Sequence, residues 1–178
     1  AEPQPSDLGA MKKDPKLLVL EQEGLNVGYL AFNTQKAPFD KLEVRQAIHM
    51  ALNRAAYLEA VYLGFASIAK NPLPPSLWGY NKSIKDYEYN VEKAKALLKK
   101  AGFEKGFETT LWYLPVSRPY NPAAKKMAEM MQADLAKIGI KLNLVTFEWA
   151  TYLAKARKGE HEMLLAGWTA DIGDPDNF

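Results

Sequence analysis

Residues 121–144 read NPAAKKMAEMMQADLAKIGIKLNL, and this stretch contains two different periodicities. Pro122 suits the first turn of a helix, because the N–H that proline lacks would be unpaired there. The helix is expected to continue to about Ile138, where Gly139 stops it. Every second residue is then apolar, as in a strand with one buried side: Ile140, Leu142 and Leu144. The stretch predicts a helix that leads directly into a strand.

The same alternation extends to both sides of this stretch. Apolar runs and period-two patterns predict further strands at residues 17–20, 27–33, 109–113 and 163–168. Further helices are expected near residues 6–14, 42–63, 91–100 and 147–158. Residues 65–90, rich in proline and aromatic residues, indicate an ordered loop. Strands that alternate with helices along the chain predict an α/β fold.

Composition excludes several classes of protein. The 178 residues suffice for one sizeable core, or for one domain and part of a neighbour. Because 23 basic residues nearly balance 21 acidic ones, charge gives no reason to expect binding to nucleic acid. No apolar run approaches the ~20 residues of a membrane helix. The absence of cysteine excludes disulfides, thiolate zinc sites and cysteine nucleophiles.

No catalytic, metal or cofactor site is expected. His49 and His161 are too few and too isolated for a catalytic or metal constellation. There is no Gly-x-Ser-x-Gly nucleophile motif and no glycine-rich phosphate loop. The spacing of four further residues does not fit a calcium loop, which also needs a glycine and a distal glutamate: Asp171, Asp174, Asp176 and Asn177.

An ordered set of motifs runs along almost the whole chain. They are 24–30 (GLNVGYL), 44–47 (VRQA), 69–75 (AKNPLPP), 78–81 (WGYN), 92–98 (EKAKALL), 115–122 (PVSRPYNP) and 167–178 (GWTADIGDPDNF). Together they resemble the dipeptide-binding branch of the large extracellular solute-binding proteins. That family also includes oligopeptide-, nickel-, haem- and glutathione-binding relatives. One such motif would be weak, but the set in this order is specific.

The resemblance implies a two-lobed periplasmic binding protein that closes over its ligand. Members of the family are much longer than this chain, so we expect an internal segment. Residues 1–23 would be the tail of the first lobe and the hinge region. Residues 24–178 would be the second ligand-binding lobe, truncated at its C-terminal end, with a mixed sheet flanked by helices.

The resemblance also assigns ligand-binding residues. A zwitterionic dipeptide has an ammonium and a carboxylate, and burying both is costly unless each meets an opposite charge. By resemblance, Asp171 would hold the α-amino group and Arg118 the carboxylate, which a planar guanidinium can bind with two hydrogen bonds. Trp168 and Tyr120 would be aromatic walls beside the peptide. The chain departs from the family pattern at two positions, with Ala170 in place of glycine and Ile172 in place of a polar residue.

The expected function is therefore capture of dipeptides in the periplasm and their delivery to an ABC permease in the inner membrane. The receptor would be a monomer without cofactor or nucleic acid, and not an enzyme. The same receptor class with haem or glutathione as cargo is an alternative. A peptide hydrolase would need a nucleophile and base or metal ligands, which the sequence does not supply. A pure interaction domain would instead show a large exposed apolar patch without a charged cleft.

Overall fold

The computed structural model describes residue 3 and residues 5–178. The helices are α1 (Pro5–Met11), α2 (Leu42–Ala51), α3 (Arg54–Tyr62), α4 (Val91–Lys100), α5 (Ala124–Ala136) and α6 (Trp149–Arg157). The strands are β1 (Asn26–Phe32), β2 (Glu108–Trp112), β3 (Lys141–Val145) and β4 (Met163–Thr169). A short 3-10 helix, Pro175–Asn177, follows β4. The described part of the chain contains no helix with the length and hydropathy of a membrane span.

The strands form one mixed sheet in the order β1-β4-β2-β3. β1 is antiparallel to β4, whereas β2 is parallel to both β4 and β3. The expected α/β class with a mixed sheet is confirmed. Because β2, β3 and β4 run in one direction, their carboxyl ends point to the same edge of the sheet, and this edge positions the site described below.

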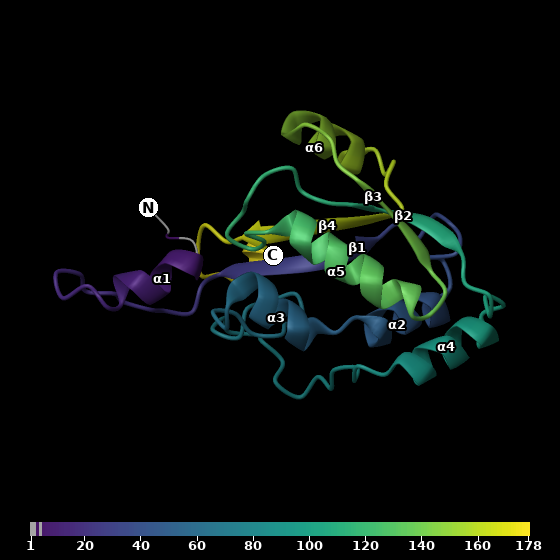
Figure 1. The fold of residues 1–178 in the computed structure, drawn as a ribbon, viewed down its shortest axis with the longest axis horizontal. Coiled ribbons are helices and arrows are strands. Elements are labelled where there is room, and N and C mark those ends of the chain that lie inside the picture. Colours follow the sequence, from purple (N-terminus) through teal and green to yellow (C-terminus); the bar gives the residue numbers. More distant parts are fainter. Residues whose placement is uncertain (1–2, 4) are drawn as a thin grey trace.

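Helices cover both faces of the sheet (Figure 1). On one face α2, α3, α4 and α5 pack over alternate strand residues, among them Leu111, Met163 and Leu165. On the other face α6 packs its buried Tyr152 against Trp112 and Leu164. Neighbouring strand residues thus belong to different cores, as the period of two in a strand requires.

The helix expected over 42–63 is interrupted. α2 ends at Ala51, and Leu52 is extended with ψ at 118°. Asn53 then caps α3, because its side chain accepts a hydrogen bond from the N–H of Ala56 at 3.2 Å. The N–H of Asn53 donates to Asp134 Oδ2 of α5 at 2.9 Å, so a partner outside the helix satisfies the group that the break exposes.

The strand expected at residues 17–20 is absent, and this prediction is wrong. The segment forms no β-ladder with other described residues, and Leu18 and Leu20 are 84% and 83% exposed. With α1 it projects from the body of the molecule (Figure 1). Apolar residues indicate that a segment is suited to burial, but a strand also needs a neighbour for its backbone hydrogen bonds.

Other boundaries follow local capping chemistry. The expected helix 91–100 is confirmed, with the Asn90 side chain accepting from the N–H of Lys93 at 2.9 Å. The helix expected from Pro122 begins at Ala124, and the one expected from residue 147 begins at Trp149 after the capping residue Glu148. The loop over 65–90 has no helix or strand, as expected.

Candidate functional site

Three segments follow the parallel strands at the same edge of the sheet. Residues 113–123 follow β2, residues 146–148 connect β3 to α6, and residues 170–178 follow β4. The first two are tied together beyond the strands, because Thr146 Oγ1 donates to the carbonyl of Tyr113 at 3.0 Å. In α/β sheets ligands characteristically bind at such a carboxyl edge. All four residues predicted to bind ligand lie in or next to these segments.

Arg118 and Tyr120 share one tight turn. The N–H of Arg118 donates to the carbonyl of Asn121 at 3.2 Å, and the N–H of Asn121 donates back at 2.9 Å. Pro119 and Tyr120 form the tip between them, and the proline fixes the backbone angle that the first tip position requires. Asn121 is 4% exposed, so its burial anchors the turn to the body of the lobe.

Tyr120 joins this turn to β1 and β4. Its carbonyl accepts a hydrogen bond from the hydroxyl of Tyr62 at 2.7 Å. Its ring lies against Gly167 of β4, where a Cβ atom would overlap it. Burial raises the pKa of the Tyr120 phenol, and the nearby Arg118 partly offsets this effect. The expected wall residue is therefore half-buried, and it brings the turn of Arg118 against the strand that leads to Asp171.

The guanidinium of Arg118 rests on an indole rather than on a carboxylate. Its Cζ lies 4.3 Å from the centroid of the Trp149 ring, which is cation–π geometry. Among the described residues, the Arg118 side chain forms no ion pair and no hydrogen bond. Its N–H groups thus have no hydrogen-bond acceptor in the described part of the chain.

Trp168 and Asp171 are organised by a shared acceptor. Asn177 Oδ1 accepts from the indole N–H of Trp168 and from the backbone N–H of Asp171, both at 3.1 Å. The Trp168 side chain is 48% exposed and can still contact a ligand. The Asp171 carboxylate has no ion pair among the described residues and is exposed.

The segment 170–178, which carries Asp171, packs against the loop over 65–90. Leu77 is buried, and its Cδ2 would lie 3.9 Å from a Cβ atom at Gly173. A Cβ atom at Gly79 would likewise lie 3.8 Å from Pro175 Cγ. This proline-rich loop therefore has a structural role beside the site.

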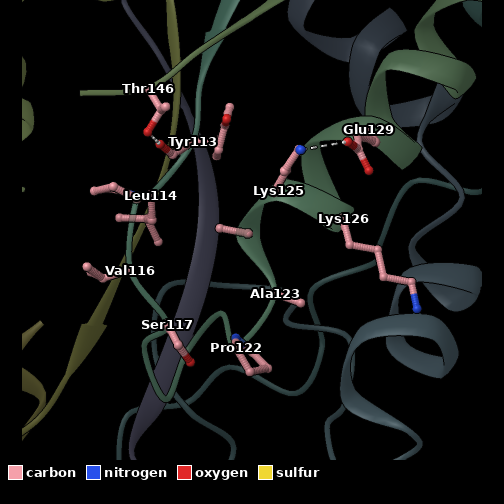
Figure 2. A pocket seen from close by; sticks show the side chains of 12 residues that line it. Tyr113, Leu114, Val116, Ser117, Pro122, Ala123, Lys125, Lys126, Glu129 and Thr146 are labelled. Atoms are coloured by element: carbon pink, nitrogen blue, oxygen red, sulfur yellow. Dashed lines mark hydrogen bonds and ion pairs between the residues drawn. The ribbon is translucent and has the colours of Figure 1, made fainter. Parts of the chain in front are cut away.

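An open groove of about 610 Å³ lies beside the segment that carries Arg118 but contains none of the predicted anchors. It runs between residues 113–117 and the start of α5 (Figure 2). Lys125 and Glu129 form an ion pair across one turn of α5 at its rim, and Lys126 extends toward α3, where its Nζ donates to the carbonyl of Ala60 at 2.7 Å (Figure 2). Arg118, Tyr120, Trp168 and Asp171 lie outside its lining. We identify the candidate site with the unpaired charges, not with this groove.

The described residues contain no group of three His, Asp or Glu side chains that could hold a metal ion. Two functional candidates, Trp149 and Asn177, were missed by sequence reasoning. The sequence places Asn177 in the motif 167–178, without a role of its own, and Trp149 only in a helix. The signal for Trp149 is its place at the start of the helix that follows β3, a strand parallel to β2, at the edge where ligands bind.

The sequence matches the family of bacterial extracellular solute-binding proteins, family 5 Middle, over residues 1–178. It is 54% identical over 176 residues to the dipeptide-binding protein of Escherichia coli K12, covering 99% of this chain and 33% of that protein. It is 56% identical over 176 residues to heme-binding protein A of Haemophilus influenzae Rd, covering 99% and 32% respectively. The chain thus spans about a third of the length of the curated relatives it matches.

A solved structure has the same fold. It is the dipeptide binding protein from Pseudoalteromonas sp. SM9913 in complex with Met-Leu, which superposes with a TM-score of 0.90 at 42% identity. The match covers 98% of this chain and 34% of that one. The family expected from the ordered motifs is confirmed.

Proposed function

The chain belongs to the bacterial extracellular solute-binding proteins of family 5, and on this premise we propose that it forms half of a dipeptide-binding cleft. The receptor captures dipeptides reversibly in the periplasm and delivers them to an ABC permease in the inner membrane. No bond is made or broken, so the protein acts as a carrier and not as an enzyme. Closure of two lobes around the ligand is a hinge transition, and the permease recognises the closed state.

One observation carries this proposal. A carboxylate and a guanidinium, Asp171 and Arg118, lie in segments at the same sheet edge, and neither has an ion-pair partner among the described residues. In a closed cleft each would compensate one charge of a zwitterionic peptide. Half-exposed Trp168 and half-buried Tyr120 would supply apolar contact beside these anchors.

The lobes are proposed to divide at residue 24. Residues 24–178 form the second ligand-binding lobe, and residues 1–23 are the tail of the first lobe with the hinge region. The exposed leucines of the segment 17–20 support this division, because they would be buried by the rest of the first lobe.

Haem or glutathione is the alternative cargo. The 56% identity to heme-binding protein A is as high as the identity to the dipeptide-binding relative, so identity alone does not separate the two ligands. Unpaired charges of opposite sign favour a zwitterionic peptide. Glutathione carries two carboxylates and would call for further basic groups.

The test is calorimetric titration of the full-length receptor, the native protein that contains this chain. The ligands are a dipeptide, a tripeptide, glutathione and haem, at a fixed salt concentration. We expect the dipeptide to bind most tightly. Tighter binding of haem or glutathione would show that this ligand, and not a dipeptide, is the cargo. Titration curves that show no saturable binding for any of the four ligands would refute the receptor function.

A further inference from the structure

We infer that Trp149 is a positioning residue that makes the receptor selective for ligands with a free carboxylate. Its indole holds the Arg118 guanidinium in place without neutralising it, so that the N–H groups at the guanidinium edge remain available to the ligand. The inference rests on the proposed function, because it concerns the same anchor. It adds the residue that orients the anchor.

The contact geometry supports this role. Arg118 Cζ lies 4.3 Å from the Trp149 ring centroid, within the ~6 Å limit for a cation–π interaction. A guanidinium is planar and stacks on an aromatic face while its N–H groups point outward in its own plane. An acidic partner would occupy those N–H groups, and a ligand would then have to displace it. The indole restrains the cation and leaves its hydrogen-bonding edge open.

Trp149 is itself held rigidly. It is the first residue of α6, and its ring stacks on Tyr152 with centroids 6.0 Å apart and an interplanar angle of 14°. Tyr152 is 2% exposed, and its hydroxyl donates to the carbonyl of Leu165 in β4 at 2.7 Å. Trp149 and Tyr152 therefore connect the Arg118 guanidinium to β4, the strand that contains Trp168 and leads to Asp171.

The acid nearest in sequence to Trp149 is engaged elsewhere. Glu148 caps α6, with its carboxylate accepting from the N–H of Ala150 at 2.9 Å and of Thr151 at 3.2 Å. These backbone hydrogen bonds lower the pKa of Glu148, so it remains an anion committed to the helix start. The pair Glu148-Trp149 thus provides a cap from one residue and a restraint for Arg118 from the next.

The backbone of Arg118 is also fixed. Its N–H and carbonyl are paired with Asn121 in the tight turn, and Asn121 is buried. With the backbone fixed and the guanidinium held over the indole, little side-chain freedom remains to be lost when a carboxylate binds. Such pre-organisation strengthens binding because the ordering cost has already been met in the free protein.

The experiment compares two ligands in the full-length receptor, a dipeptide and the same dipeptide with a C-terminal amide. Trp149→Leu removes the aromatic face and keeps an apolar side chain. We expect it to weaken the free dipeptide by about 3- to 30-fold, the range of a partly desolvated cation–π contact. The amide, which cannot use the charge of Arg118, should change by less than about 2-fold, so that the preference for the carboxylate falls.

The control is Trp149→Leu in an Arg118→Ala background, where it should have no further effect because the group it positions is gone. An equal loss for both ligands, or additive losses, would overturn the inference. If Trp149→Leu does not fold, Trp149→Phe serves instead, with a smaller loss of the same preference expected and an equal loss for both ligands overturning it. Wild-type receptor that binds no dipeptide would instead refute the proposed function.

Discussion

Gly28 and Gly167 are direct cross-strand partners of β1 and β4, and Tyr120 covers both. The Tyr120 ring lies over Gly167 and its carbonyl oxygen over Gly28. Direct partners in an antiparallel pair point to the same face of the sheet. Two glycines therefore leave a bare patch of backbone on which the turn of Arg118 rests.

Replacing Gly167 with alanine should displace this turn. The new Cβ atom would overlap the Tyr120 ring and lie 2.7 Å from the carbonyl oxygen of Val27, so the turn or the strand must move. We expect a loss of about 1–3 kcal/mol in the free energy of unfolding, measured with denaturant. Gly9→Ala is the control, because no atom lies within 4 Å of its added Cβ. Equal stability of the two variants would contradict the packing described.

Asn177→Ala should weaken dipeptide binding although Asn177 is not itself a proposed anchor. The substitution removes the acceptor shared by the Trp168 indole and the Asp171 N–H. Loss of these hydrogen bonds corresponds to about 0.5–2 kcal/mol in binding free energy, measured by calorimetry on the full-length receptor. Asn177→Asp retains an acceptor and should bind more tightly than the alanine variant. Alanine with unchanged affinity would exclude a positioning role for Asn177.

Periodicity made the order of most elements predictable from sequence, because an amphipathic helix or strand repeats its apolar residues locally. The break before α3 was not predictable. The N–H of Asn53 is satisfied by Asp134, 81 residues away, and no local pattern reports such a partner. The strand prediction for the segment 17–20 was wrong for a related reason. Its apolar pattern indicates burial, but no local pattern shows whether a neighbouring strand is present.

The candidate site shows the same limit. Asp171 and Arg118 were found from motifs that resemble the family, but Trp149 could be linked to Arg118 only through the parallel pairing of β2 and β3. A cation–π contact between residues of different segments cannot be predicted from the residue pattern of either segment. The sequence therefore indicated the charged groups, whereas their orientation required the fold.

Asp134 should make the stability of the lobe depend on acid pH. Burial alone raises the pKa of this carboxyl, but hydrogen bonds from Lys137, Tyr57 and the N–H of Asn53 outweigh burial and hold the pKa below its ordinary value of 3.8. Such a group stabilises the fold above its unfolded pKa, and the contribution is lost as pH falls through the folded-state pKa. The wild type should therefore lose stability as the pH falls below about 4.

Asp134→Asn should remove this contribution, lowering the free energy of unfolding at neutral pH by about 1–3 kcal/mol because polar groups are left unpaired. The difference from wild type should shrink in acid, as wild-type Asp134 becomes protonated. Asp40→Asn is a matched control at an exposed carboxylate with no ion pair among the described residues. A difference that stays constant from neutral pH to about pH 3 would disprove the linkage.

Asp171→Ala should damage ligand binding more than Arg118→Ala in the full-length receptor. Every α-peptide carries the amino group that Asp171 is proposed to meet, whatever its length, and a desolvated ammonium without a partner costs on the order of 2–5 kcal/mol. Arg118→Ala should weaken dipeptides strongly but longer peptides less, because the carboxylate of a longer peptide lies farther along the cleft. The measurement is a set of dissociation constants for a dipeptide and a tripeptide at fixed salt, with circular dichroism to show that both variants fold. If Arg118→Ala weakens both ligands equally and Asp171→Ala changes neither, the assignment of the two anchors is wrong.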